Sequence, residues 1–272
     1  MRICVDPGHS KQVNHSPIRP DFAEGDRMWV LGLMLRDALQ RRGVEVVMTK
    51  DSLDANPNLA ERGAKANGCD AFISLHANSP AHRPDGTYDE TISGVVVFYP
   101  IKQPEVVPLA EVIADRVADV MHTKVFDVTC KESEASPGLD YYGVLRASVR
   151  AGCPYDLIVE HGFYTNKENV DFLMDDDNLA KIAEVEAKTL VDWCRVHEQY
   201  VYRVQCGAYS ERKNAFDKVE RLKQDGFDAF MEHTDLWRVY AGSFYIEANA
   251  VKEVEKLKEK GYEAFIVPKV MR

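Results

Sequence analysis

Short apolar runs alternate with helix-like patterns along residues 1–197. The apolar runs lie at residues 3–5, 44–48, 71–75, 95–99 and 157–160. Between them, apolar residues spaced three or four apart mark helical segments at residues 28–42, 59–67, 108–122 and 178–197. This alternation is typical of βαβ units. It predicts an α/β fold with an open, mostly parallel, twisted sheet that carries helices on both faces.

One segment in this region has no regular pattern. Residues 123–140 show neither a helical nor an alternating period, and they include the charged run Lys-Glu-Ser-Glu at residues 131–134. We therefore expect a surface loop or a short irregular piece there.

The rest of the chain contains an internal repeat with an offset of 35 residues. Residues that recur across this offset are Val204 and Val239, Gly207 and Gly242, Ala215 and Ala250, Leu222 and Leu257, and Gly226 and Gly261. Each copy has the pattern of a strand, a helix, a glycine stop and a second strand. Two copies predict a small βαββαβ domain, in which a four-stranded sheet carries two helices on one face. We therefore expect two domains, residues 1–197 and residues 198–272.

Composition and charge exclude several classes of protein. Of the 272 residues, 45% are hydrophobic and 29% are charged, which is typical of a folded chain and not of a disordered one. No apolar run approaches the ~18 residues that span a bilayer, and the net charge of −10 argues against a nucleic-acid binder. From Tyr200 on, 13 basic and 12 acidic residues give +1, against −11 for the preceding part. This asymmetry supports two modules.

The beginning of the chain and its cysteines indicate synthesis in the cytoplasm. Residues 1–6 lead directly into an apolar strand, without the basic and apolar regions of a signal peptide. The 6 cysteines are scattered without a Cys-x-x-Cys pair. Reduced thiols are therefore expected, and not a set of disulfides.

Two histidines stand where apolar strands end. His9 follows the first strand, and His76 ends the run at residues 71–75. Open α/β sheets place their sites at these strand ends. Glu24 stands between the two histidines in the sequence, just ahead of the first helix, where a carboxylate can face the same crevice. Each residue also has a simpler explanation, because a histidine can satisfy a turn and a carboxylate can favour a helix N-terminus. Two strand-end histidines in one sheet are nevertheless a metal pattern.

A further apolar strand runs directly into Glu160 and His161. Since side chains alternate along a strand, only one of these two neighbours is expected to reach the crevice. Two imidazoles and one carboxylate would complete a zinc site with an open position for water. A second carboxylate nearby could move protons for hydrolysis of an amide.

Taken together, these motifs resemble the zinc-dependent N-acetylmuramoyl-L-alanine amidases of the type called amidase 3, over about residues 1–197. The matching motifs are Val5-Asp6-Pro7-Gly8-His9, Glu24, Leu59-x-x-Arg62 with Ala66-Asn67, Asp70-x-Phe72-Ile73-Ser74-Leu75-His76-Ala77-Asn78, and Glu160-x-Gly162-Phe163-x-x-Asn166. The resemblance implies that His9, Glu24 and His76 are zinc ligands and that Glu160 is the catalytic acid/base. It also implies cleavage of the bond between the lactyl group of N-acetylmuramic acid and the L-alanine of the stem peptide.

The sequence departs from the family pattern at two positions. Ser10 stands where a second glycine is common, and His161 where an apolar or small residue is usual. Neither is an implied ligand. His161 is, however, a rival of Glu160 for the role in proton transfer.

The repeat resembles a SPOR (sporulation-related repeat) domain, whose opening motif is matched by Val204-Gln205-Cys206-Gly207-Ala208-Tyr209. Such domains bind peptidoglycan, particularly glycan strands stripped of their stem peptides. The sheet face opposite Val204 is expected to carry Arg203, Gln205, Arg238 and Tyr240. Aromatic and planar polar groups on an open sheet suit a sugar chain, although any one of them could be an ordinary solvated residue.

The sequence therefore predicts a cell-wall hydrolase that uses Zn²⁺ and acts on peptidoglycan. Two alternatives are a zinc hydrolase of another amide, such as a peptidase or sugar deacetylase, and a wall-binding protein with an inactive enzyme domain. The presence of all four implied site residues argues against the second. Because the substrate lies outside the membrane, we expect a protein that reaches the wall after release, as a phage endolysin or a mother-cell lytic amidase does.

Overall fold

A computed structural model of the chain describes residues 1–198 and 201–269. The chain divides into two compact units, Met1–Cys194 and Arg195–Arg272. Tyr200 and residues 270–272, which the charge count assigns to the second module, lie outside the described residues. No described helix combines the length and apolarity that crossing a membrane requires.

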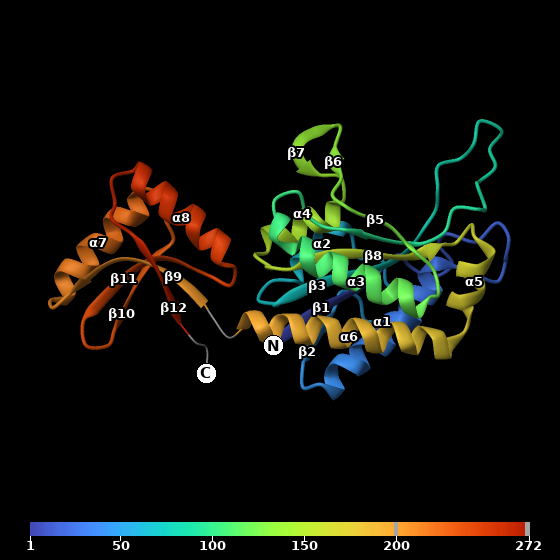
Figure 1. Ribbon diagram of the computed structural model, residues 1–272, viewed down its shortest axis with the longest axis horizontal. Helices are drawn as coiled ribbons and strands as arrows, with labels where there is room; N and C mark the ends of the chain where they lie inside the picture. The colour runs from blue at the N-terminus through green and yellow to red at the C-terminus, as the bar shows by residue number, and fades with distance from the viewer. Residues whose placement is uncertain (199–200, 270–272) are drawn as a thin grey trace. The chain divides into compact units, whose positions relative to one another are not determined.

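A sheet of six strands forms the centre of the first unit (Figure 1). Its strands are β1 (Arg2–Pro7), β2 (Glu45–Met48), β3 (Ala71–Asn78), β4 (Val95–Phe98), β5 (Val125–Thr129) and β8 (Asp156–Phe163). They lie in the order β2-β1-β3-β8-β4-β5. β1, β2, β3 and β8 are parallel to one another, β4 is antiparallel to β8, and β5 is parallel to β4. The predicted α/β sheet is confirmed, with two strands running opposite to the other four.

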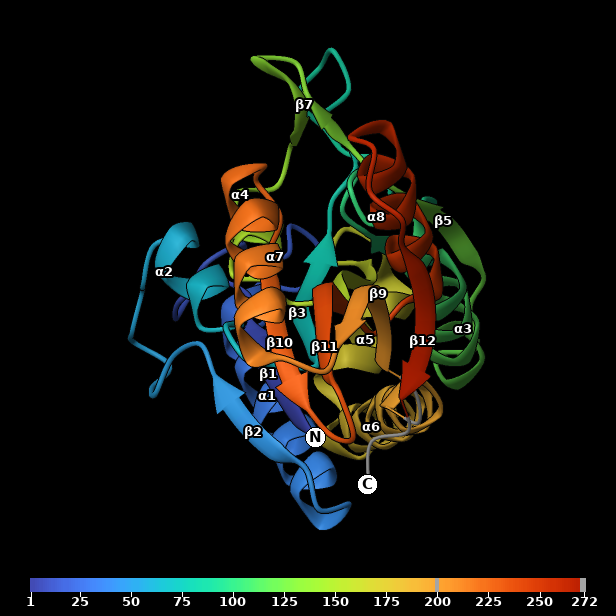
Figure 2. The same cartoon turned by 90° about the vertical axis from the view of Figure 1, so that its left-hand side faces the viewer.

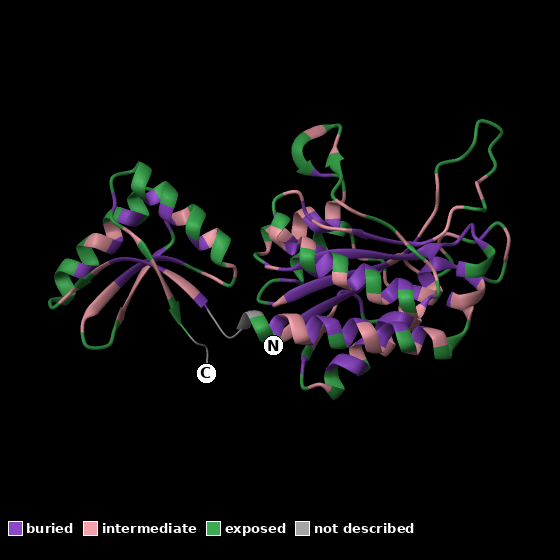
Figure 3. Ribbon diagram, in the orientation of Figure 1, coloured by how far each residue is buried: buried purple, intermediate pink, exposed green. Residues whose placement is uncertain are grey.

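Helices cover both faces of this sheet, as predicted. They are α1 (Glu24–Arg41), α2 (Leu59–Ala64), α3 (Val107–Val120), α4 (Gly143–Arg150), α5 (Lys167–Met174) and α6 (Asp176–Glu198), with a 3₁₀ turn, η1, at Pro104–Val106. α6 contacts both α1 and α3 on one face, because Glu184 accepts a bond from Arg41, the last residue of α1, and Thr189 accepts one from Arg116 at 2.9 Å. Figure 3 shows the buried strands between the half-exposed helices.

The opposite face of the sheet packs against α4. Cys4, Phe72 and Ile158 share one buried cluster with Val144 and Leu145 of that helix. Ile3, Val5 and Ile73, which alternate with the residues of this cluster along β1 and β3, are completely buried as well. Burial on both faces explains why these strands read as continuous apolar runs in the sequence.

The first helix begins earlier than expected. We predicted a start at residue 28 with Glu24 ahead of the helix, but Glu24 is the first residue of α1. The residue before it is Ala23, whose side chain cannot cap the helix, so the sequence carries no signal for this start. A Cβ on Gly25 would lie 1.9 Å from the carbonyl oxygen of Ser10, which shows how closely the helix end approaches the loop after β1.

The prediction of a loop over residues 123–140 is wrong. This segment forms the edge strand β5 and a hairpin of β6 (Glu132–Ser133) and β7 (Ser136–Asp140). An edge strand is partly solvated, and Phe126 of β5 is 48% exposed, so no clear apolar alternation marks the strand. The hairpin pairs through its backbone and projects from the unit (Figure 1).

The second unit is the predicted βαββαβ domain. Its elements are β9 (Val201–Tyr209), α7 (Arg212–Gln224), β10 (Ala229–His233), β11 (Trp237–Phe244), α8 (Glu247–Glu259) and β12 (Phe265–Lys269). The strands form an antiparallel sheet in the order β10-β11-β9-β12, and both helices cover the same face of it (Figure 2).

The core of this unit repeats with the sequence. The buried cluster contains both members of each repeated pair: Val204 and Val239, Ala215 and Ala250, Val219 and Val254, and Leu222 and Leu257. Gly226 and Gly261 follow the two helices with φ of 92° and 79°. Only glycine adopts this backbone conformation without strain, which explains why both copies stop at a glycine.

Candidate active site

Two neighbouring cavities open at the carboxyl ends of β1, β3 and β8. The larger has a volume of about 630 Å³ and the smaller about 390 Å³. His9, His76, Tyr142 and Glu160 line both of them. The position agrees with the general rule that open α/β sheets bind ligands beyond the carboxyl ends of their strands.

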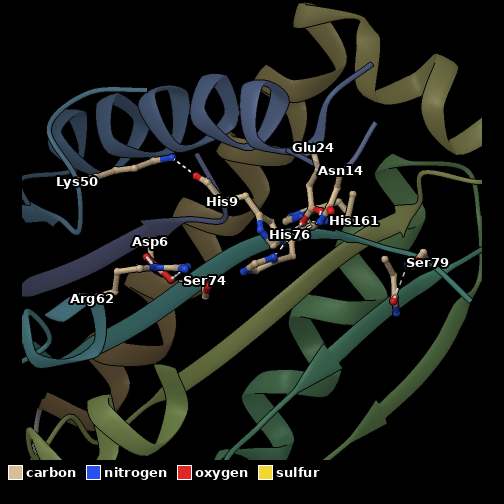
Figure 4. Close-up of polar contacts among 12 residues, drawn as sticks. Asp6, His9, Asn14, Glu24, Lys50, Arg62, Ser74, His76, Ser79 and His161 are labelled. Atoms are coloured by element: carbon tan, nitrogen blue, oxygen red, sulfur yellow. Dashed lines mark hydrogen bonds and ion pairs between the residues drawn. The ribbon is translucent and has the colours of Figure 1, made fainter. Parts of the chain in front are cut away.

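Three predicted metal ligands meet at this point. One donor atom from each of His9, Glu24 and His76 lies within 4.8 Å of the others. Glu24 Oε1 is 2.9 Å from His76 Nδ1 and 3.4 Å from His9 Nε2. Figure 4 shows the two imidazoles converging on the carboxylate from the loop after β1 and the end of β3.

The backbone of the loop after β1 is specialised for this approach. His9 has a φ of 56°, a left-handed conformation that is uncommon for non-glycine residues. A Cβ on Gly8 would lie 2.5 Å from Cε1 of His76, so only glycine lets the two histidine-bearing segments come together. Lys50 donates a hydrogen bond to the carbonyl oxygen of His9 and holds the loop from the other side.

Hydrogen bonds orient the carboxylate of Glu24. The backbone N–H of Ala77 donates to Oε1 at 3.0 Å, and the side-chain amide of Asn14 donates to Oε2 at 2.6 Å. Glu24 itself is only 1% exposed. Such partners are what a metal-binding carboxylate needs to keep a fixed position. Sequence analysis missed Asn14, which no recognisable motif marks.

The electrostatics of the cluster favour an ionised Glu24 and a neutral His76. Burial would raise the pKa of Glu24, but hydrogen bonds from His76 and His9 outweigh burial and hold the pKa below its ordinary value. Burial lowers the pKa of His76 despite its contact with Glu24. Carboxylate and neutral imidazole are the forms that bind metal ions.

Glu160 lies directly across from this cluster. It pairs in register with His76 between β8 and β3, and its side chain lines both cavities. Burial, and then the charge of Glu24, raises its pKa well above the ordinary value. A carboxyl group that holds its proton more tightly than usual is suited to exchange protons with a reacting group near neutral pH.

His161, the neighbour of Glu160, faces away from the cavities toward α6. Its Nε2 lies 3.0 Å from Glu186 Oε1, and both side chains are completely buried. Its Nδ1 donates to the carbonyl oxygen of His76 at 2.9 Å. The structure therefore places Glu160 against the cluster and gives His161 a buried hydrogen-bond partner, Glu186, that sequence analysis did not identify.

A buried network beneath the site holds β1, β3 and α2 together. Asp6 is completely buried and accepts two bonds from Arg62, at 2.8 and 2.6 Å, and one from Ser74 at 2.6 Å (Figure 4). Burial would raise the pKa of Asp6, but its contacts with Arg62 lower it below the ordinary value. Asp6, Arg62 and Ser74 all belong to the family motifs, and the structure shows that they support the loop carrying His9.

The second unit presents the predicted sheet residues on the face opposite its helices. Tyr240 is 5% exposed and Gln205 is 8% exposed, so neither is a solvated sheet residue. Tyr240 stacks on Phe230 with ring centroids 5.3 Å apart, and the Arg203 guanidinium lies 5.0 Å from its ring. Arg238 is bonded to Asp235 in the turn before β11.

Comparison with protein families and solved structures agrees with this arrangement. The Amidase_3 family model, described as N-acetylmuramoyl-L-alanine amidase, matches residues 3–191, and the SPOR domain model matches residues 198–268. The amidase CwlM of Bacillus licheniformis is 24% identical over 241 residues, which are 86% of each protein.

Two solved amidases share the fold of the first unit. AmiC2 of Nostoc punctiforme is 24% identical with a TM-score of 0.57, over 72% of this chain and 97% of that one. The catalytic domain of CwlV from Bacillus (Paenibacillus) polymyxa is 19% identical with a TM-score of 0.58, over 72% of this chain and 98% of that one. With the family match over most of the first unit, these findings identify the chain as a member of the Amidase_3 family, an N-acetylmuramoyl-L-alanine amidase with a C-terminal SPOR domain.

Proposed function

We propose that His9, Glu24 and His76 hold a zinc ion, and that Glu160 moves the protons during cleavage of the amide between N-acetylmuramic acid and L-alanine. The observation that carries the proposal is the spacing of the three donor atoms, with a buried carboxyl group opposite them. Family membership supports the same reaction.

The donor set fits zinc in type and in spacing. A tetrahedral ion with ligands at about 2.0–2.1 Å keeps its ligand atoms about 3.3 Å apart. The separations of 2.9 and 3.4 Å from Glu24 Oε1 to the two histidine nitrogens are close to this value. Two imidazoles and one carboxylate also form one of the known ligand sets of catalytic zinc, with a fourth position left for water.

The roles of the protein groups follow from their positions. Bound zinc would supply an acidified water and Lewis-acid polarisation of the scissile carbonyl group. Glu160, as a carboxylate beside the attacking water, accepts a proton as the new C–O bond forms. It then returns that proton to the alanine nitrogen as the C–N bond breaks, so that the leaving group departs as a neutral amine.

The SPOR unit would hold the enzyme on the glycan. Register places one residue from each strand in a row across the open face: Phe230, Tyr240, Gln205 and Phe265. Phe265 is 56% exposed at one end of this row. Because Tyr240 and Gln205 are nearly buried, we expect them to contact sugar only at their edges, with Arg203 and Arg238 beside the row.

Peptidoglycan is the proposed partner, and the wall is the proposed place of action. We expect the enzyme to reach the wall after release from the cytoplasm, because its substrate lies outside the membrane. A phage endolysin and a mother-cell lytic amidase both fit this route.

Metal analysis combined with mass spectrometry of digested peptidoglycan tests the proposal. We expect about one zinc per chain, together with new L-alanine amino termini and no new reducing ends. Replacing His76 with alanine should abolish zinc binding and activity, whereas His82→Ala, which changes an exposed histidine outside the cluster, should do neither. Full zinc and full activity in His76→Ala would refute the ligand assignment. Release of acetate, or cleavage inside the stem peptide, would favour a deacetylase or a peptidase instead.

A further inference from the structure

The two cavities that meet at the site differ in the chemistry of their walls. Leu59, Val144 and Ile158 line the larger one, whereas Asn78, Ser79 and Tyr164 line the smaller one. His9, His76, Tyr142 and Glu160 lie between the two. When the bond to be cleaved lies at these shared residues, the group on one side of the bond enters one cavity and the group on the other side enters the other.

The larger cavity has a mainly apolar wall. Leu59, at the start of α2, is 49% exposed, and a Cβ on Gly143 would lie 2.9 Å from its Cδ1, so the starts of α2 and α4 form one surface. Two polar residues of this cavity already have partners inside the protein. Asn58 caps α2 through Glu61, and Arg62 is bonded to Asp6.

The smaller cavity offers polar and aromatic groups. Asn78 is the last residue of β3 and Ser79 follows it, and the backbone N–H of Tyr164 donates to the carbonyl oxygen of Asn78 at 2.9 Å. The side-chain Oδ1 of Asn78 accepts from the N–H of Ser79 at 2.8 Å. Among the described residues, none accepts from its Nδ2 group, so this donor can serve a ligand. Tyr141, 52% exposed, adds an aromatic ring at the same cavity.

The two halves of the substrate differ in the groups that a cavity wall would meet. On one side of the scissile amide, beyond the short lactyl group, is a sugar with hydroxyl groups and an acetamido group, each of which costs about 1–3 kcal/mol when it is buried without a partner. On the other side the methyl group of L-alanine comes first, and the polar remainder of the stem peptide extends beyond it. Both volumes lie in the range of about 300–1,000 Å³ that is usual for ligand sites.

We propose that the substrate crosses the site in one direction, with the sugar in the smaller cavity at Asn78 and the stem peptide in the larger cavity at Leu59. This inference rests on the proposed function and adds the orientation of the substrate. Asn78 and Leu59 are then the residues that recognise sugar and peptide respectively.

Truncated substrates test the orientation, because the effect of a variant should disappear when its target group is absent. The three substrates are N-acetylmuramyl tripeptide, the D-lactyl tripeptide that lacks the sugar, and N-acetylmuramyl tripeptide with glycine in place of L-alanine, which lacks the methyl group. Asn78→Ala should lower kcat/KM about tenfold on the complete substrate, the value of one good hydrogen bond, and less than about twofold on the lactyl tripeptide. Leu59→Ser should lower it about tenfold on the complete substrate and less than about twofold on the glycine substrate. Leu139→Ser, which changes an exposed leucine of β7 outside both cavities, is the control.

The reverse pattern, or equal losses on all three substrates, would overturn the orientation. A second measurement does not depend on turnover: N-acetylmuramic acid should perturb the backbone amide NMR signals of Asn78, Ser79 and Tyr164 in the zinc-loaded protein, and L-alanyl-D-glutamate those around Leu59. If each fragment instead perturbs the signals expected for the other fragment, the inference is overturned even if cleavage proceeds normally. If the wild-type protein does not cleave the muramyl amide at all, the proposed function fails, and the NMR assignment still decides where each fragment binds.

Discussion

Replacing His161 with alanine is expected to destabilise the catalytic unit strongly without removing a group that touches the substrate. His161 and Glu186 are both completely buried and lie 3.0 Å apart between β8 and α6. The variant leaves the carboxyl group of Glu186 buried without its imidazole partner. It also removes the donor to the carbonyl oxygen of His76.

The expected loss is large because the buried carboxyl group of Glu186 would lose its partner. Removing one side of a buried salt-bridging pair typically costs about 3–5 kcal/mol. The double variant His161→Leu/Glu186→Leu removes both polar groups and fills the space, so it should lie within about 2 kcal/mol of the wild type. Glu184→Ala is a matched control on the same helix, because Glu184 is 45% exposed and its pairs with Arg41 and Arg42 should be worth at most about 1 kcal/mol.

Urea unfolding followed by tryptophan fluorescence measures this loss. In a Trp237→Phe background the remaining tryptophans, Trp29 and Trp193, both belong to the first unit, so the signal reports that unit alone. A chelator keeps bound metal from adding to stability. With a slope of about 2–3 kcal/mol per molar urea, the midpoint of His161→Ala should fall by about 1–2 M. A loss below about 1 kcal/mol, or a double variant as unstable as the single one, would refute the reasoning.

Three other predictions test the proton-transfer group, the buried acid at the far end of β8, and the division of labour between the units. Glu160→Gln should keep stoichiometric zinc while the hydrolysis rate falls ~10²–10⁴-fold, and a fully active Glu160→Gln would refute its role in proton transfer. Burial raises the pKa of Asp156 to about 8, above its unfolded value of 3.8, so the folded state alone keeps a proton between these values. The free energy of unfolding should therefore fall by up to about 1.4 kcal/mol per pH unit as pH rises through this window, and Asp156→Asn should abolish that slope in unfolding experiments at pH 5 to 8. Truncation after His197 should leave cleavage of small soluble muropeptides nearly unchanged and reduce cleavage of intact sacculi, because tethering raises the local concentration of enzyme at the wall. The isolated segment from Tyr200 on should sediment with peptidoglycan, more so after the stem peptides are removed; equal sedimentation would reject a preference for bare glycan.

The parts of the fold that the sequence predicted are those with a strong local pattern. The strands buried on both faces appear as continuous apolar runs, and residues of the site such as His9 and His76 lie near their carboxyl ends. The repeat predicts the second unit well, because both copies must fill the same core positions. Val204 and Val239 are both completely buried for this reason.

Elements without such a pattern were missed. β5 is a partly solvated edge strand, and the hairpin of β6 and β7 is held by backbone bonds, so neither carries an apolar period. The start of α1 at Glu24 depends on how closely Gly25 packs on the loop after β1, a contact between segments that no local rule describes.

The sequence by itself determined that His9, Glu24, His76 and a residue at the end of β8 belong near one sheet edge, because strand ends and family motifs are local features. Only the tertiary structure decided that Glu160 faces the cavities and His161 faces α6. Alternation along a strand separates two neighbours onto opposite faces, but it does not say which face holds the site. That depends on the register of β8 with β3 and on the helix that supplies Glu186, both of which are set by contacts between residues far apart in the chain.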